Sequence, residues 1–329
     1  MADRSAIEWC HATINAISGC SPESPGCTNC FAMRAGGRNR PNHPATGLTQ
    51  PSKAGHVWTG AVRFNEDWLR RPLTWARPRR IFWNAHGDPF HPAVPAHWVD
   101  RELAAAALTP QHRHILLTKR SARMRAYFAD PEVPERVLDA ARYLQSLPAA
   151  WQWPLPNLWL GVSVEDQPRA DQRIPDLLST PAAVRWISAE PLLEHIDVIK
   201  VLARWLDATP HADRRHIGLG RPLLDWIVAG GESGPGARPM HPFWVCHLRD
   251  QCASAGIPFL FKQWGEWGCM HAGETGDAGR MVPAFPDSEY GFPMVRIGKK
   301  RAGRLLDGVL HDAYPELFAH ERPVPEALS

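Results

Sequence analysis

The chain has 329 residues, of which 44% are hydrophobic and 22% are charged, as is usual for a soluble globular protein. The net charge of +3 permits a polyanionic partner but does not require one. No apolar run approaches the roughly 18 residues of a membrane span, and the first residues do not form a signal segment. We therefore expect a cytoplasmic protein with no membrane partner.

The first notable element is a loop, residues 19–32, that contains Cys20, Cys27 and Cys30. Its two prolines and two glycines predict an irregular loop, and the residues from Phe31 onward predict a helix. Structural zinc usually has four protein ligands, so a zinc site would require Cys10 or a histidine as the fourth. Three cysteines suffice for a [4Fe–4S] cluster with one open iron. A disulfide is disfavoured because the chain has seven cysteines and no secretory context.

After a polar stretch, residues 38–53, that we expect to be irregular, short apolar runs alternate with helical patterns. The expected strands are 13–17, 81–83, 114–117, 158–162, 184–187, 226–229 and 258–261. The expected helices include 98–108, 132–147, 170–178 and 243–255. Such alternation is typical of βαβ units, and it predicts an α/β fold: a partial or full TIM-like (β/α) barrel of about six or seven parallel strands.

Polar residues follow each expected strand, where a (β/α) barrel places its functional groups. Together they would form a ring that holds a charged small molecule at the barrel mouth. Each residue taken alone could equally be a cap or a loop ion pair. The residues selected from this ring are Asn84, Asp88, Lys119, Ser163, Glu165, Glu190, Glu232 and Lys262.

Other features are weaker indicators. His86 and His91 are second-tier metal ligands, more typical of capping or surface residues. The turn 230–234 is glycine-rich and would allow a ligand to approach the backbone closely, but it lacks the spacing of a dinucleotide or phosphate motif. Cys246 and Cys252 are expected to be small core residues.

The chain leaves the barrel near residue 268, so we expect a barrel domain, residues 1–267, and an irregular C-terminal extension, residues 268–329, packed on it. This extension carries a basic segment, residues 298–304, and Trp264 and Trp267 stand before it. Basic groups beside aromatic rings suit a nucleic-acid backbone and an exposed base. A solvated loop is the alternative interpretation.

The cysteine loop and four strand-end motifs, Asp88-Pro89-Phe90, Thr118-Lys119-Arg120, Gly161–Glu165 and Gly230–Pro239, give the sequence a resemblance to a known family. It resembles a phage-associated three-cysteine family of unknown function, which in turn is similar to radical S-adenosylmethionine (SAM) enzymes of the spore photoproduct lyase branch. In that branch a C-x3-C-x2-C loop binds the cluster. Here six residues separate Cys20 from Cys27, and Cys10 stands where threonine is expected.

The resemblance implies a radical SAM enzyme in which Cys20, Cys27 and Cys30 hold a [4Fe–4S] cluster whose open iron binds SAM. Reduction would then generate a 5′-deoxyadenosyl radical, with a reductase or another electron donor as partner. Candidate SAM contacts are Asn29, Asn84, Asp88, Ser163, Glu165, Glu190 and Glu232, and Lys119 and Lys262 are candidates for placing a substrate phosphate. The expected substrate is nucleic acid or a nucleotide, for modification or repair.

Two alternatives remain open from the sequence. One is a non-catalytic zinc or iron–sulfur module that binds nucleic acid or a partner in phage or anti-phage systems. The other is a hydrolase that uses Glu165, Glu190 and Glu232 around a structural metal, although no nucleophile–base pair is identifiable by spacing.

Overall fold

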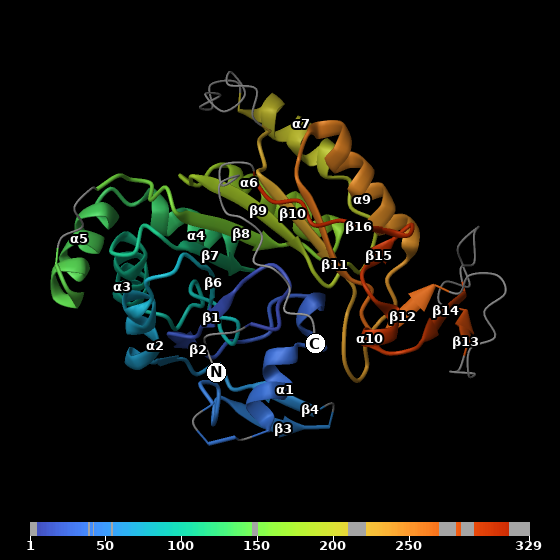
Figure 1. The fold of residues 1–329 in the computed structure, drawn as a ribbon, viewed down its shortest axis with the longest axis horizontal. Coiled ribbons are helices and arrows are strands. Elements are labelled where there is room, and N and C mark those ends of the chain that lie inside the picture. Colours follow the sequence, from blue (N-terminus) through green and yellow to red (C-terminus); the bar gives the residue numbers. More distant parts are fainter. Residues whose placement is uncertain are drawn as a thin grey trace.

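A computed structural model of the chain describes residues 5–38, 40–41, 43–53, 55–146, 151–209, 222–269, 281–283 and 293–315. Its centre is a seven-stranded sheet in the order β1-β6-β7-β8-β9-β10-β11, in which every neighbouring pair is parallel. The strands are β1 (Ala12–Ile14), β6 (Arg80–Trp83), β7 (Arg113–Thr118), β8 (Leu158–Ser163), β9 (Val184–Ala189), β10 (Trp226–Gly230) and β11 (Phe259–Gln263). The sheet curls into a partial TIM-like barrel with β1 and β11 at its edges (Figure 1). The predicted fold class is confirmed.

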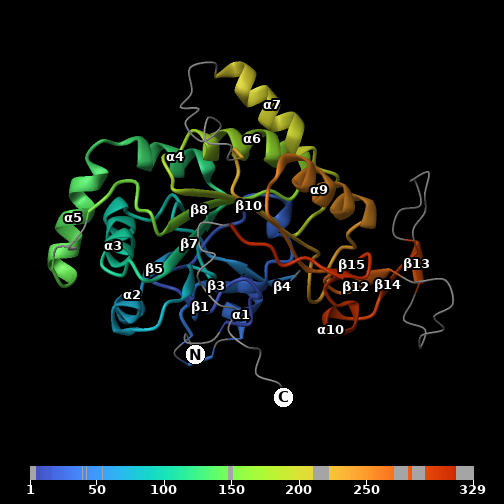
Figure 2. The same ribbon diagram turned by 45° about the horizontal axis from the view of Figure 1, so that its top comes forward.

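Helices follow the strands and cover one face of the sheet. They are α3 (Ala96–Ala107), α4 (Ser121–Ala129), α5 (Val133–Leu144), α6 (Gln167–Leu178), α7 (Val198–Ala208) and α9 (Pro242–Ala255). Figure 2 shows them as an arc around the sheet. Four of these six helices were predicted, whereas α4 and α7 were not. In the described part of the chain, no helix is both long and apolar enough to cross a membrane.

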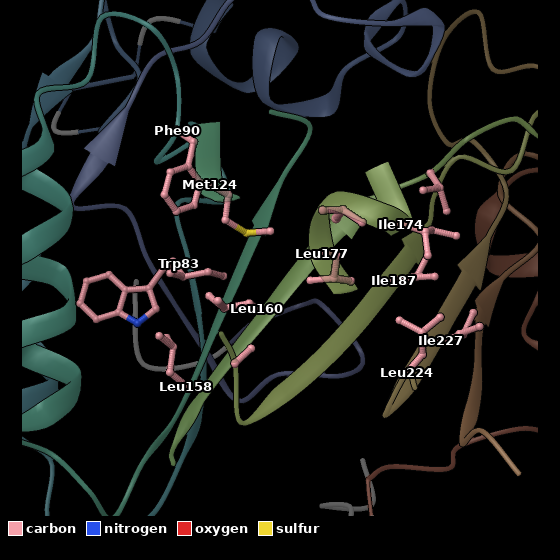
Figure 3. Close-up of a cluster of buried hydrophobic side chains, with 14 of the residues drawn as sticks. Trp83, Phe90, Met124, Leu158, Leu160, Ile174, Leu177, Ile187, Leu224 and Ile227 are labelled. Carbon is pink, nitrogen blue, oxygen red and sulfur yellow. The ribbon is translucent and has the colours of Figure 1, made fainter. Parts of the chain in front are cut away.

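Both faces of the sheet are apolar, which is why its strands are mostly unbroken apolar runs. On the helical face, side chains such as Trp83, Leu160, Ile187 and Ile227 pack against α4 and α6 residues in a large buried cluster (Figure 3). The alternate residues point to the other face. There Trp159, Trp186 and Trp226 form a second cluster with Trp9 and Phe82. These four tryptophans are buried and therefore fill a core rather than a surface.

The N-terminal region lies at the carboxyl ends of the strands and carries the cysteine loop (Figure 1). Strand β2 (Ile17–Ser18) pairs with β5 (Arg63–Phe64), and the loop contains the 3-10 turn η1 (Pro25–Cys27) before α1 (Phe31–Gly37). The prediction that residues 38–53 are irregular was partly wrong. Thr49–Ser52 form β3, which pairs with β4 (Gly55–Trp58), and α1 packs on this hairpin. Helix α2 (Glu66–Arg70) and turn η2 (Arg71–Thr74) lead into β6.

The C-terminal extension contains β12 (Trp267–Cys269), β13 (Met281–Pro283), β14 (Pro293–Arg296), α10 (Lys299–Ala302), β15 (Leu305–Leu306) and β16 (Val309–Leu310). It packs on edge strand β11: Leu306 is buried, and Phe261 donates its backbone N–H to the carbonyl of His311. Trp264 is buried and donates its indole N–H to the carbonyl of Leu305 at 2.8 Å. It therefore anchors the extension instead of offering a ring for base stacking, and the exact boundary at residue 268 stays a prediction.

Candidate functional site

A cavity of about 250 Å³ lies where the cysteine loop covers the carboxyl ends of the strands. The sequence predicted functional side chains at this place, because parallel strands end at one edge of a sheet. All the selected residues except Glu165 line this cavity: Cys20, Cys27, Asn29, Cys30, Asn84, Asp88, Lys119, Ser163, Glu190, Glu232 and Lys262. Glu165 is fully buried directly behind its wall. The strand ends and the loop thus form one site.

The three thiols of the loop share this cavity. Cys30 immediately precedes α1 as its N-cap, and the Cys27 sulfur lies 3.4 Å from the backbone nitrogen of Glu23. Burial raises the pKa of Cys20 to about 12, to which Asp88 adds, and burial also raises the pKa of Cys30. Both shifts favour the protonated thiols of Cys20 and Cys30 when no metal is bound, and a bound metal would displace these two protons. Within the described residues, no three side chains of His, Cys, Asp or Glu form a group that could hold one metal ion.

Three thiols on one cavity are the number of protein ligands that a [4Fe–4S] cluster with one open iron takes, whereas structural zinc usually takes four. Each thiolate of a cubane cluster binds a different iron atom, so three sulfurs around one cavity suffice. Cys10 is buried outside the cavity lining and donates to the hydroxyl of Ser5, at 3.2 Å. Cys252 is in the helical core, as predicted, and the half-buried Cys246 contacts Asp307. Cys10 is therefore not one of the thiols that line the cavity.

Arg120 joins the first cysteine to the end of β7, a contact that we did not predict. Its guanidinium lies 3.5 Å from the sulfur of Cys20, donates at 3.0 Å to the carbonyl and hydroxyl of Ser21, and forms a 2.9 Å ion pair with Asp88. Ser21 is also 2.9 Å from His91, which thereby supports the loop. The only sequence signal was the position of Arg120 directly after Thr118 and Lys119 at a strand end.

Asp88 organises the turn after β6 and the end of β7. Its carboxylate accepts hydrogen bonds from the hydroxyl of Thr118 at 2.7 Å and from the backbone N–H groups of Phe90 and Lys119 at 2.9 and 3.2 Å. With the Arg120 ion pair, both oxygens are engaged. Asp88 therefore positions the residues around Cys20, and its predicted contact with SAM stays untested.

Asn84 has a similar supporting role. Its amide nitrogen donates to both oxygens of the buried Glu102, at 2.9 and 3.0 Å, and its side-chain oxygen accepts from the backbone N–H of Ile17. Burial raises the pKa of Glu102 to about 8, and the hydrogen bond from Asn84 only partly opposes this shift. The cavity wall at Asn84 thus rests on a carboxyl that titrates near neutrality.

We expect this carboxyl to make stability depend on pH. Between about pH 5 and 8 the folded state retains the proton on Glu102 that the unfolded state has lost. The free energy of unfolding should therefore fall as pH rises through this range. Urea denaturation of the wild type and of Glu102→Gln measures the effect, because the variant lacks this titration. The exposed Glu135→Gln is the matched control; a Glu102→Gln profile parallel to the wild type would contradict the prediction.

Two further acids hold the cysteine loop. Glu165 forms ion pairs with Lys119 at 3.1 Å and Arg173 at 3.0 Å, and lies 3.4 Å from the backbone N–H of Gly26. Burial opposes its charge, but the two cations outweigh burial and lower its pKa. A Cβ at Gly26 would lie only 3.1 Å from the Glu165 carboxyl carbon and the Lys119 ammonium. Because residue 26 is a glycine, the loop can pack this closely against the side chains that follow β7 and β8.

Glu232 holds the other side of the loop. It accepts from the amide of Asn29 at 2.9 Å and pairs with Arg238 at 2.6 Å, and these bonds lower its pKa against the effect of burial. The glycine-rich turn around it serves protein packing: a Cβ at Gly231 would lie 1.9 Å from the carbonyl oxygen of Trp264. At Gly234, where φ is +91°, it would lie 2.4 Å from the Arg34 guanidinium. From the sequence, a ligand was expected to approach the backbone of this turn closely. In the structure, Trp264 and Arg34 make that close approach.

Near edge strand β11, Lys262 pairs with Glu190 at 2.9 Å, and Ser188 donates to Glu190 at 3.2 Å. Burial disfavours the charge of Lys262, but Glu190 outweighs it and raises the pKa of Lys262. Because Lys119 and Lys262 each have a carboxylate partner, phosphate binding would have to compete with these ion pairs. Their proposed role with a phosphate stays a prediction.

The fold and site define an open (β/α) barrel with a thiol-bearing cavity at its mouth. The chain belongs to the family described as a protein of unknown function, DUF5131, whose model matches residues 4–315. No curated protein matches the sequence. Two solved structures of spore photoproduct lyase, a cysteine-to-serine and a tyrosine-to-phenylalanine mutant, are both 12% identical to it, with TM-scores of 0.41 and 0.39. The matches cover 94% and 90% of this chain and 74% and 71% of those chains.

Proposed function

We propose that the protein is an iron–sulfur enzyme of the radical SAM type. The observation that carries the proposal is one cavity, at the carboxyl ends of parallel strands, lined by Cys20, Cys27 and Cys30. Three thiols leave one iron of a [4Fe–4S] cluster without a protein ligand. When bound and reduced, such a cluster supplies the electron that cleaves SAM into methionine and a 5′-deoxyadenosyl radical.

Residues of this chain would position the cluster and tune its reduction potential. Arg120 is almost completely buried and donates a hydrogen bond towards the sulfur of Cys20. Hydrogen bonds and positive charge near the sulfurs stabilise the reduced form of a cluster and raise its reduction potential. Glu165 and Glu232 fix the loop from two sides, which keeps the three sulfurs in place. Ser163 and Glu190, which line the cavity, are the preferred candidates for SAM contacts.

Nucleic acid or a nucleotide is the proposed substrate class. At the cavity lining, Phe31 is 51% exposed, immediately after the last cysteine of the loop. Exposed aromatic rings next to a basic surface bind unpaired bases by stacking. Arg38 and Arg40 are exposed beyond α1, and Lys299 and Lys300 lie on α10. An external reductase is the proposed electron donor.

Anaerobic reconstitution with iron and sulfide tests the proposal. We expect about four iron atoms per chain, an electron paramagnetic resonance signal after reduction, and a change of this signal when SAM is added. A 5′-deoxyadenosine assay then follows turnover. A protein that retains stoichiometric zinc and shows no signal that responds to SAM would contradict the proposal. The zinc-containing binding module would then replace it.

A further inference from the structure

A long segment of the chain carries no acidic side chain, and it includes Cys27 and Cys30. Residues 24–65, which we call the acid-free segment, contain no aspartate or glutamate, although the chain has 34 of these acids. Five residues of the segment are basic: Arg34, Arg38, Arg40, Lys53 and Arg63. The net charge of the whole chain is only +3, so positive charge is concentrated beside the cysteine loop.

The acid-free segment folds as a small layer next to the cavity. Its own buried apolar cluster consists of Ala32, Met33, Ala45, Leu48 and Trp58. Cys20 and Cys30 pack against this cluster. Helix α1 lies directly on the hairpin of β3 and β4 (Figure 1), so closely that a Cβ at Gly37 would lie 2.2 Å from the ring of His56. The basic residues are therefore carried by a packed layer that also holds two of the three thiols.

The exposed cations of this layer have no acid partner. They are Arg38, Arg40, Lys53 and Arg63. In the part of the chain that the structure describes, no carboxylate lies within ion-pair distance of any of them. Lys119 and Lys262 in the cavity differ, because each is already paired with a glutamate. An anionic partner can therefore bind the exposed cations without breaking an ion pair within the described protein.

A row of aromatic rings joins the cavity to these cations. Phe31 lines the cavity and is 51% exposed, and its ring centroid lies 5.9 Å from that of His86. The His86 centroid in turn lies 4.7 Å from that of His43. His43 donates its backbone N–H to the carbonyl of Arg40 at 3.1 Å, so the row ends at the exposed arginines. Grooves that bind single-stranded nucleic acids combine cations for the backbone with rings for the bases.

We propose that the acid-free segment binds the phosphate backbone of a single-stranded nucleic acid, with one base stacked on Phe31 beside the cavity. An acidic protein would be attracted by the same charge, but protein interfaces have an apolar centre. In the described part of this segment, Phe31 is the only exposed large hydrophobic side chain, which suits one base better than a protein surface. The inference deepens the proposed function and rests on it for the substrate class.

Fluorescence-anisotropy titrations of the full chain with a labelled single-stranded oligonucleotide test the proposal. The variant that combines Arg38→Gln with Arg40→Gln should bind about tenfold more weakly than the wild type. The slope of log K against log salt concentration should fall by about 0.7 for each lost phosphate contact. The control combines Arg77→Gln with Lys200→Gln, which removes the same charge from exposed positions before β6 and on α7. It should match the wild type in affinity and slope.

Phe31→Leu tests the stacked base separately. Loss of the ring should weaken binding about tenfold and leave the salt slope unchanged, because stacking neutralises no phosphate. Thermal unfolding checks the fold: Arg38 and Arg40 are exposed and lack an ion-pair partner in the described protein, so their double variant should keep the wild-type melting temperature. DNA and RNA strands of the same sequence show which of the two nucleic acids binds more tightly, and a duplex tests the preference for single strands.

Equal affinities and salt slopes for the Arg38/Arg40 variant and its control would overturn the proposal, as would a duplex that binds as tightly as the single strand. An acidic flavodoxin is the second probe. If the Arg38/Arg40 variant lost binding of flavodoxin but not of the oligonucleotide, the surface would belong to an electron donor instead. Oligonucleotide binding requires neither cluster nor SAM. A protein that assembles the cluster but binds no oligonucleotide would therefore refute this surface alone, and the converse result would refute only the radical SAM enzyme.

Discussion

Replacing Cys27 by serine is expected to abolish cluster assembly. A serine hydroxyl is a poor ligand for iron, and the remaining thiols of Cys20 and Cys30 cannot hold a [4Fe–4S] cluster at the three positions it needs. Iron content after anaerobic reconstitution should fall from about four atoms per chain to near zero. The same loss is expected for Cys20→Ser and Cys30→Ser, because all three thiols line one cavity.

Cys246→Ser is the matched control for these variants. Cys246 is half-buried on α9, where it contacts Asp307 and not the cavity. This variant should retain the wild-type iron content and spectrum. If Cys27→Ser also retained them, the cysteine loop would not be the cluster site. If Cys246→Ser lost iron together with the loop variants, non-specific binding to thiols would explain the iron of the wild type.

The second large effect is a loss of stability, which we expect for Asp88→Ala. Asp88 and Arg120 are both buried, with 7% and 4% of their side chains exposed. Removing the Asp88 carboxylate leaves the buried guanidinium with only the exposed Glu23, at 3.5 Å, as an ion-pair partner. Breaking a buried pair in this way costs about 3–5 kcal/mol. The hydroxyl of Thr118 loses its acceptor as well. Urea denaturation should therefore show a lower free energy of unfolding by about this amount.

Asp139→Ala makes the same change in the exposed ion pair between Asp139 and Arg142 on α5. Solvent-exposed pairs contribute about 0–1 kcal/mol, so this variant should unfold almost like the wild type. Similar free energies of unfolding for the two variants would show that the Asp88–Arg120 pair is not a buried structural contact.

The candidate site was largely predictable because two regularities act together. Apolar runs such as 158–162 and 184–187 identify buried parallel strands, and the chain must turn at the same edge after each of them. Ser163, Glu190 and Lys262 follow such runs, and all three line the cavity. For these three residues the position after a strand was therefore sufficient, whereas Glu165, selected by the same rule, lies behind the cavity wall.

The role of each residue was not predictable in the same way. Asp88 and Glu165 were selected as cofactor contacts, and this stays a prediction. The sequence did not show that their side chains form ion pairs with Arg120, Lys119 and Arg173. The choice of partner depends on three-dimensional distance, which strand order sets and sequence spacing does not reveal. Glu102 was missed for the same reason: its position in a helix gives no sign that it lies against Asn84.

Two local features differ from the sequence-based expectations, and each difference has a physical cause. Residues 49–52 are polar and include a proline, which indicates an irregular stretch. They nevertheless form β3, because this short strand pairs with β4 and packs against α1. Trp264 and Trp267 suggested a stacking surface near the basic segment. In the fold their indole N–H groups bind the carbonyls of Leu305 and Ala237, so both rings fasten the C-terminal extension to the barrel.

By itself the sequence determined the alternation of strands and helices, the parallel barrel, and the gathering of thiols and strand-end polar groups at one mouth. These features follow from local apolar patterns and from the common direction of the strands. The tertiary structure alone decided which acid pairs with which base. It also placed Arg120 beside Cys20, one hundred positions away in the chain. Such contacts depend on packing between distant segments, which no local pattern encodes.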